Sequence, residues 1–148
     1  MPTEAPSALP EATREASGVA VSRRHPGVLW ILDDSGPSEL YAVDAGGTLL
    51  GRVLVPGGLG RDREDLALGP CGGVDCLYIG DVGDNAEKRD SLTLYRMVEP
   101  APDAGRAAVP GAFSFRLPDG PRDVEALFVL PGERLYIVTK GRRHPPTV

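Results

Sequence analysis

Short apolar runs separated by glycine, proline and aspartate recur along almost the whole chain after residue 16. The runs are mostly four to eight residues long and rich in branched and aromatic side chains, a pattern typical of β-strands. They cover residues 18–21, 28–32, 39–43, 48–55, 66–68, 76–80, 91–97, 112–117, 124–129 and 135–139. The pattern therefore predicts an all-β chain of short strands joined by turns.

Aromatic residues recur at matching positions in these runs. Trp30, Tyr78 and Tyr136 hold the same place in the second strand of successive sets, at separations of 48 and 58 residues. The longer second interval contains a Pro/Ala/Gly-rich insertion at 99–110. A period of about 40 to 50 residues with four strands per unit is typical of β-propeller blades. The alternative is an antiparallel sandwich whose hairpins are alike by accident.

The predicted fold is thus a partial β-propeller of four-stranded antiparallel blades, with about two and a half blades in 148 residues. We expect a blade at 17–60, a second at 61–120 and half a blade at 121–148. Residues 1–16 are rich in Pro, Ala, Thr and Glu, and we expect a flexible segment there. Because propellers usually have four to eight blades, we expect the remaining blades to be missing from this chain. An oligomer, or an open stack of sheets with exposed edges, is the alternative.

Four longer stretches have recognisable sequence motifs: Val28–Gly36, Leu40–Asp44, Arg61–Ala67 and Leu77–Asn85. Together they resemble a group of bacterial, mostly exported propeller proteins whose recurring motif is close to DWEDIA…LYIGDIGDN…YR. The similarity runs from about Ser17 to Lys140. This chain has Arg63 where the group has tryptophan, and a charged residue there weakens a packing role.

The resemblance implies a propeller fold and export, but no chemistry, because no activity is established for the group. A weaker, fold-level likeness to phytase-type and lactonase-type propellers implies a calcium site. Fold alone does not determine function, so any site has to be argued from the residues themselves.

Carboxylates recur at matching ends of the predicted strands. Glu64 and Glu125 directly precede the first strand of their blades, a place that Ser17 holds in the first blade. First strands of propeller blades are innermost, so these side chains should converge at one mouth of the channel. Converging carboxylates repel one another unless a cation lies among them, and Ca²⁺ takes six to eight oxygen ligands. We therefore expect a calcium or substrate-phosphate site built from Glu64, Asp81, Asp84, Asn85 and Glu125.

The same residues also have a purely structural interpretation. Asp, Asn and Gly favour turns because they form Asx-turns or adopt left-handed conformations, which would explain Asp84 and Asn85 without any ligand. Asp33 and Asp81 both end a second strand, where the third set has Thr139. Neither the acidic loop that begins at Asp33 nor the one that begins at Asp81 has the twelve-residue spacing of an EF-hand.

Two cysteines, Cys71 and Cys76, flank a short turn between two predicted strands. A hairpin brings such flanking residues within the Cα separation of about 4.4–6.8 Å that a disulfide allows. We expect a structural disulfide, with free thiols as the alternative; zinc would need further ligands, and His25 and His144 lie in other turns. A disulfide indicates an oxidising, extracytoplasmic compartment. The N-terminus lacks the charged-then-apolar layout of a signal peptide.

The net charge and the missing motifs exclude several classes of function. A net charge of −5 and a pI near 5.0 argue against nucleic-acid binding, and no apolar run reaches the roughly 20 residues of a membrane span. Nucleophile-elbow, phosphate-loop, dinucleotide and zinc-protease motifs are missing, and no catalytic residue is predicted. We therefore expect a binding or scaffold module with an unidentified small-molecule or protein ligand. The alternative is a fragment of a calcium-dependent propeller hydrolase acting on phosphate esters or lactones, in which Glu64 and Glu125 hold the metal.

Overall fold

The computed structural model describes residues 6–141 and 143–148, which form ten strands and one short 3-10 helix. The elements are η1 (Glu11–Thr13), β1 (Ala16–Val21), β2 (Leu29–Asp33), β3 (Glu39–Val43), β4 (Leu49–Leu54), β5 (Arg63–Cys71), β6 (Val74–Asp81), β7 (Leu92–Val98), β8 (Gly111–Phe115), β9 (Val124–Leu130) and β10 (Arg134–Thr139). Each predicted run overlaps one of these strands, so the all-β prediction is confirmed. No helix in the described part of the chain is long and apolar enough to cross a membrane.

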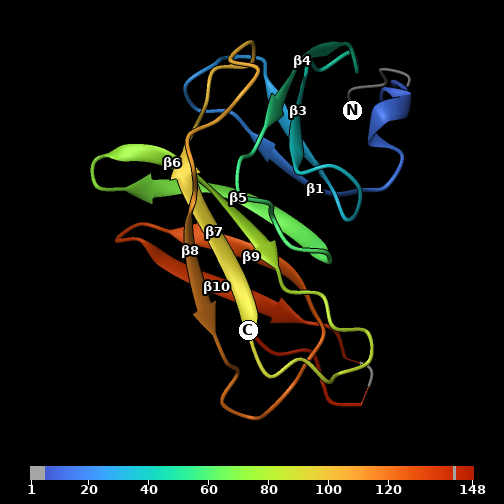
Figure 1. The fold of residues 1–148 in the computed structure, drawn as a ribbon, viewed down its shortest axis with the longest axis vertical. Coiled ribbons are helices and arrows are strands. Elements are labelled where there is room, and N and C mark those ends of the chain that lie inside the picture. Colours follow the sequence, from blue (N-terminus) through green and yellow to red (C-terminus); the bar gives the residue numbers. More distant parts are fainter. Residues whose placement is uncertain (1–5, 142) are drawn as a thin grey trace, which may run out of the picture.

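The strands form two four-stranded antiparallel sheets, in the orders β1-β2-β3-β4 and β5-β6-β7-β8, and a β9-β10 hairpin. Within each sheet the paired strands are consecutive in sequence, so both four-stranded sheets are simple meanders (Figure 1). The four-stranded antiparallel units are therefore confirmed. Over residues 6–141 and 143–148 no sheet closes on itself, and the arrangement of blades in a ring stays a prediction.

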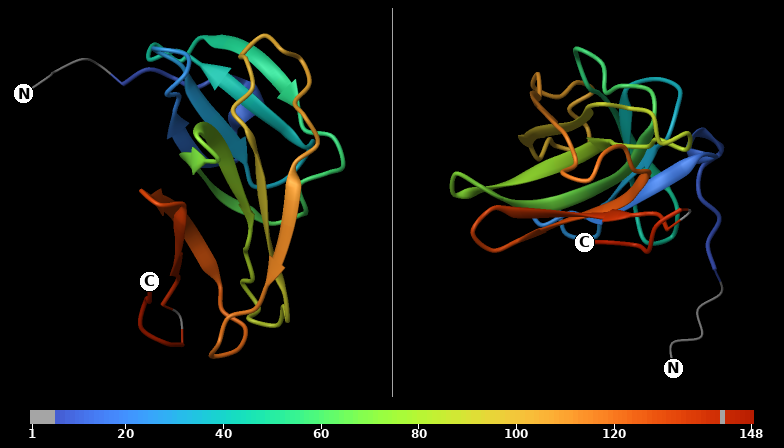
Figure 2. Two further views of the ribbon diagram at one scale, coloured as in Figure 1. Left: turned by 90° about the vertical axis from the view of Figure 1, so that its left-hand side faces the viewer. Right: turned by 90° about the horizontal axis from the view of Figure 1, so that it is seen from below.

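The first strands of the three sheets lie side by side, with β5 between β1 and β9 (Figure 2). Gly18 permits the close approach of β1, because a Cβ atom there would lie 2.7 Å from the backbone nitrogen of Leu66. On the other side, Asp65 links the second sheet to the third: its Oδ2 accepts a hydrogen bond of 2.8 Å from the backbone N–H of Leu127.

Each of these first strands has a β-bulge near its beginning. The residue that is left without a paired partner is Ser17 in β1, Glu64 in β5 and Glu125 in β9. A bulge bends the strand and redirects the side chain of the extra residue. The three residues predicted to be equivalent therefore occupy the same local geometry.

The apolar core lies mainly between the sheets. Trp30, Leu40 and Leu77 are fully buried between the first and second sheets, and Tyr78 packs with Leu127 between the second and third. The indole nitrogen of Trp30 donates to the Glu99 carboxylate at 2.9 Å. Glu99 is the first residue of the 99–110 insertion, so this bond also connects the insertion to the first sheet.

Arg63 is only 2 % exposed, and its guanidinium group donates to backbone carbonyls at the end of β2, in the loop after β2 and in the loop before β5. The acceptors are Asp33 and Gly60, both at 3.0 Å, Ser35, and Gly36 at 3.4 Å. The expectation that a charge weakens packing at this position is wrong, because the guanidinium saturates otherwise unpaired carbonyls while its stem is buried.

Two segments outside the sheets pack against the first sheet. The Pro/Gly-rich insertion pairs with the outer edge of β4, where Leu54 donates to the Gly105 carbonyl at 3.0 Å and accepts from the Ala107 N–H at 2.8 Å. At the other end of the chain η1 contacts β2 and buries Thr13. Residues 11–13 of the N-terminal segment therefore lie on the first sheet, residues 1–5 lie outside the described residues, and the flexibility of 1–16 stays a prediction.

Candidate metal centre

Three carboxylates from the second and third sheets meet at one end of the molecule. Glu64 is the bulge residue of β5, Glu125 is the bulge residue of β9, and Asp123 lies one residue before β9. One oxygen of each lies within 4.8 Å of the other two. The structure thus brings together two of the predicted site residues, Glu64 and Glu125, and adds a third.

Asp123 is the buried member of this cluster, with no exposed surface. Its Oδ1 accepts a hydrogen bond of 2.8 Å from the Asp84 N–H, and its backbone carbonyl accepts one of 2.7 Å from the Lys140 N–H. These bonds fix Asp123 between the loop after β6 and the end of β10. Its Oδ2 is buried and has no hydrogen-bond partner. A buried carboxylate oxygen normally has one, so this atom provides an unsatisfied ligand position.

Burial and the neighbouring negative charges disfavour the ionised form of Glu64. Burial, followed by the charges of Glu125, Asp62 and Asp123, raises the pKa of Glu64 from 4.5 to about 7. Near neutral pH the carboxyl is therefore divided between its charged and uncharged forms. A bound cation would remove the repulsion that raises the pKa and would keep the group ionised.

Lys140 supplies one positive charge beside the cluster. Its Nζ lies 2.6 Å from Glu125 Oε1 and 3.8 Å from Asp123 Oδ2, and its side chain is 40 % exposed. Only the shorter contact is a hydrogen bond. One ammonium group is outnumbered by the three carboxylates, so the cluster keeps an excess of negative charge.

Gly83 forms the wall of the site next to Asp62 and Glu64. A Cβ atom on Gly83 would lie 2.4 Å from Asp62 Cγ and 2.5 Å from Glu64 Oε1. Both carboxylates therefore pack directly on the glycine backbone, and its N–H donates to the Asp62 carbonyl at 3.1 Å. Any side chain here would displace the carboxylates.

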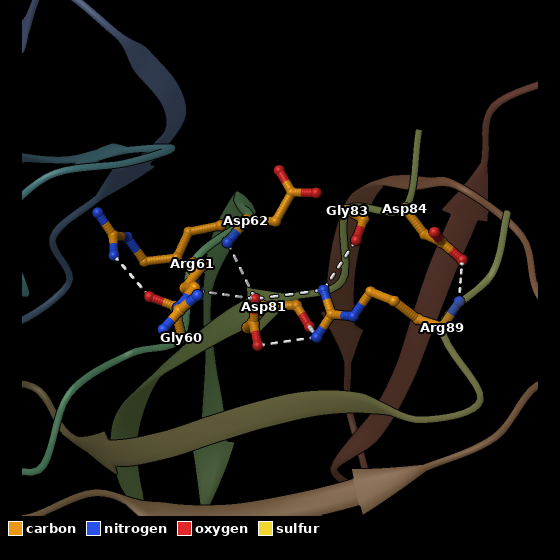
Figure 3. A network of polar contacts seen from close by, with 8 residues as sticks. Gly60, Arg61, Asp62, Asp81, Gly83, Asp84 and Arg89 are labelled. Atoms are coloured by element: carbon orange, nitrogen blue, oxygen red, sulfur yellow. Dashed lines mark hydrogen bonds and ion pairs between the residues drawn. The ribbon is translucent and has the colours of Figure 1, made fainter. Parts of the chain in front are cut away.

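Two of the other predicted ligands, Asp81 and Asp84, belong to a second network, drawn in Figure 3. Asp81 forms a two-point ion pair with Arg89, at 2.9 and 3.3 Å, and accepts from the backbone N–H groups of Arg61 and Asp62. Asp84 Oδ2 accepts from the Arg89 N–H at 2.7 Å. Asp84 thus stabilises a turn, as expected if it has no ligand. The charge of Asp81 is already balanced by the guanidinium group of Arg89.

Asn85 is exposed on the same loop and is not one of the three clustered residues. The five predicted ligands therefore fall into two groups. Glu64 and Glu125 belong to the cluster, whereas Asp81, Asp84 and Asn85 lie at and after the end of β6, where Arg89 binds both aspartates. The loop still supports the cluster, since its Asp84 N–H fixes Asp123.

Sequence reasoning missed Asp123, although a signal was present. Asp62-Arg63-Glu64 and Asp123-Val124-Glu125 have the same D-x-E spacing. A bulge at the glutamate brings each aspartate to the same end of its strand. The pattern would have predicted a pair of carboxylates from each sheet rather than one.

Cys71 and Cys76 lie at disulfide-bonding distance across the β5–β6 hairpin, with Cα atoms 5.8 Å apart. Both are largely buried and pack with Tyr78. The pairing expected from the sequence is confirmed in its geometry. It is compatible with an extracytoplasmic protein.

Comparison with protein-family models, curated proteins and solved structures finds no match to this chain. Family membership and export therefore stay predictions from the sequence, and function has to be argued from the site.

Proposed function

We propose that this chain is a non-enzymatic binding or scaffold module of propeller type whose Glu64–Asp123–Glu125 cluster holds a divalent cation. The observation that carries the proposal is Asp123, a fully buried carboxylate with one oxygen fixed by a backbone N–H and the other without a hydrogen bond, and with an oxygen within 4.8 Å of two further carboxylates. Leaving such an oxygen unsatisfied costs free energy, and a cation offsets that cost.

The chemistry of the cluster favours Ca²⁺. Its ligands are hard carboxylate oxygens, whereas zinc sites generally include cysteine or histidine. Ca²⁺ binds oxygen at 2.3–2.6 Å, so two oxygens on one ion lie at most about 5 Å apart, and the clustered oxygens meet that limit at 4.8 Å. Mg²⁺ needs near-ideal octahedral geometry at shorter distances, which is less suited to side chains from two sheets.

The propeller arrangement is supported by three features of the sheets. Both complete sheets are four-stranded meanders, their first strands lie side by side, and each first strand has its bulge at the position predicted to be equivalent. In such an arrangement the ion would join two adjacent blades at their inner ends. Its role would be to hold the module in shape for a small-molecule or protein ligand.

A calcium titration of the oxidised chain tests the proposal. An ion that binds only the folded form stabilises it by about 2.7 kcal/mol at a concentration of 100 times Kd, which a thermal melt detects. The stabilisation should disappear in Glu125→Gln and in Asp123→Asn. It should persist in Asp119→Asn, which removes an exposed carboxylate outside the cluster. A folded wild-type chain without any shift in Tm would contradict the proposal.

A hydrolase is the second candidate, and the pKa of Glu64 is the observation that favours it. A carboxyl group with a pKa near 7 can act as a general base at neutral pH, and a neighbouring cation would polarise a phosphate or lactone oxygen. Hydrolysis of a phosphate monoester or a lactone that requires Ca²⁺ and is lost in Glu64→Gln would support this function. A chain that binds Ca²⁺ but hydrolyses neither would be a binding module.

A further inference from the structure

The carboxylate cluster is accompanied by a positively charged side chain of the same chain. Lys140 follows β10, and its backbone N–H donates to the Asp123 carbonyl at 2.7 Å, so its Cα is fixed beside the cluster. From there the side chain reaches Glu125, with Nζ 2.6 Å from Oε1. The ammonium group therefore lies against two of the three carboxylates.

Lys140 satisfies these carboxylates unequally. Its Nζ is 3.8 Å from Asp123 Oδ2, beyond the 2.7–3.2 Å range of hydrogen bonds, and Oδ2 has no other hydrogen-bond partner. The ammonium group thus neutralises part of the cluster without satisfying its buried oxygen. A divalent ion at a bonding distance of about 2.4 Å would do so.

The ammonium group and a divalent ion cannot share Glu125 without a penalty. An ion that binds Glu125 Oε1 at about 2.4 Å would lie at most about 5 Å from Nζ in its present position. Like charges at this separation repel strongly in a partly buried site. The lysine side chain has a long stem and is 40 % exposed, so a path to solvent is open to it.

We propose that Lys140 is a displaceable resident cation, whose ammonium group offsets part of the negative charge of the cluster until a divalent ion binds and then turns out into solvent. The inference rests on the proposed cation site and adds its regulation: Lys140 sets the concentration at which the ion binds. An occupied site would then expose a lysine, and an ion-free site would hold it against Glu125.

Calorimetric titration with Ca²⁺ of the wild type, Lys140→Gln and Lys88→Gln tests this inference. The chain has only these two lysines, and Lys88 is exposed on the loop after β6, so Lys88→Gln matches the change in net charge. Removal of the competing charge should tighten Ca²⁺ binding about tenfold in Lys140→Gln, while Lys88→Gln should bind like the wild type.

The outcomes separate this inference from the proposed function. Equal affinity in wild type and Lys140→Gln, or weaker binding in Lys140→Gln, overturns the role of Lys140 and leaves the cation site intact. Absence of binding in all three proteins overturns the site and the inference together. A tenfold gain that Lys88→Gln shares would be a long-range charge effect and would also overturn it.

A spectroscopic measurement follows the displacement without a mutation. Dimethylation with ¹³C keeps the lysine charge and gives two side-chain signals, one for each lysine. The Lys140 signal should move towards that of Lys88 as Ca²⁺ saturates the site. A signal that stays in place while Ca²⁺ binds overturns the displacement.

Discussion

Glu64 and Glu125 are the unpaired bulge residues of two neighbouring first strands, β5 and β9, and their carboxylates meet in one cluster. In a regular strand alternate residues point to opposite faces, and a one-residue change in register would separate the two side chains. The bulges remove this restriction, because each redirects one side chain. The site therefore depends on a backbone irregularity that occurs in both sheets.

Replacing Glu64 by Gln should stabilise the ion-free protein at high pH. The unfolded state releases the Glu64 proton near pH 4.5 and the folded state near pH 7, so stability falls as pH rises between these values and then stays lower. Allowing for solvent screening at this half-buried group, the variant should gain about 1 kcal/mol at pH 8 and little at pH 4.5.

Urea denaturation in the presence of a chelator at the two pH values measures this effect. Glu11→Gln is the control, because Glu11 is exposed and forms a surface ion pair with Arg14, away from the cluster. An equal effect of Glu64→Gln at both pH values would show that repulsion within the cluster does not limit stability.

Replacing Arg63 by Ala should be strongly destabilising. The change leaves four backbone carbonyls without their donor and opens a cavity in a buried region. We expect a loss of about 3 kcal/mol, measured as the change in free energy of unfolding. Arg61→Ala is the matched control, because the Arg61 side chain is exposed; a loss as large in the control would contradict the assigned role of Arg63.

Replacing Gly83 by Ala should impair the cation site more than the fold. The added methyl group would collide with the ends of the Asp62 and Glu64 side chains, which can move, so the loss in stability should be about 1 kcal/mol. Ca²⁺ affinity should fall about tenfold because the carboxylates are displaced. In Gly46→Ala, a surface-turn control with looser contacts, affinity should not change; unchanged affinity in Gly83→Ala would place the ion elsewhere.

Reduction of the Cys71–Cys76 pair should lower stability modestly. The bridge closes a loop with a sequence separation of 5, for which chain entropy gives about 2 kcal/mol. Thermal melts with and without a thiol reductant measure the difference. A Cys71→Ser/Cys76→Ser variant should melt like the reduced wild type and be insensitive to the reductant; a reductant effect in that variant would point to a cause other than the bridge.

Most of the strand layout was predictable because local patterns determine it. Trp30, Tyr78 and Tyr136 sit in the strands that their apolar surroundings indicated, and each complete meander follows chain order. The length of β5 was not predictable: Pro70 argues against a central strand, but β5 pairs only with β6 in its sheet, and a proline is tolerated at such an edge.

The site was predicted less completely because contacts distant in sequence decide it. Glu64 and Glu125 follow from their place at the start of the strands, whereas Asp123 is selected by hydrogen bonds from Asp84 and Lys140. Asp81 lies in an equally acidic sequence, but Arg89 folds back eight residues later and neutralises it. No local pattern distinguishes a carboxylate with a guanidinium partner from one without.

The pairing of the 99–110 insertion with β4 also has a kinetic consequence. The Leu54–Arg106 bridge closes a loop of roughly fifty residues that contains most of the second sheet, and contacts of such sequence separation slow folding. The outer edge of the first sheet should therefore stay open to intermolecular pairing until the second sheet has formed. Aggregation during refolding should depend on this interval, and the two sheets should unfold in one cooperative transition.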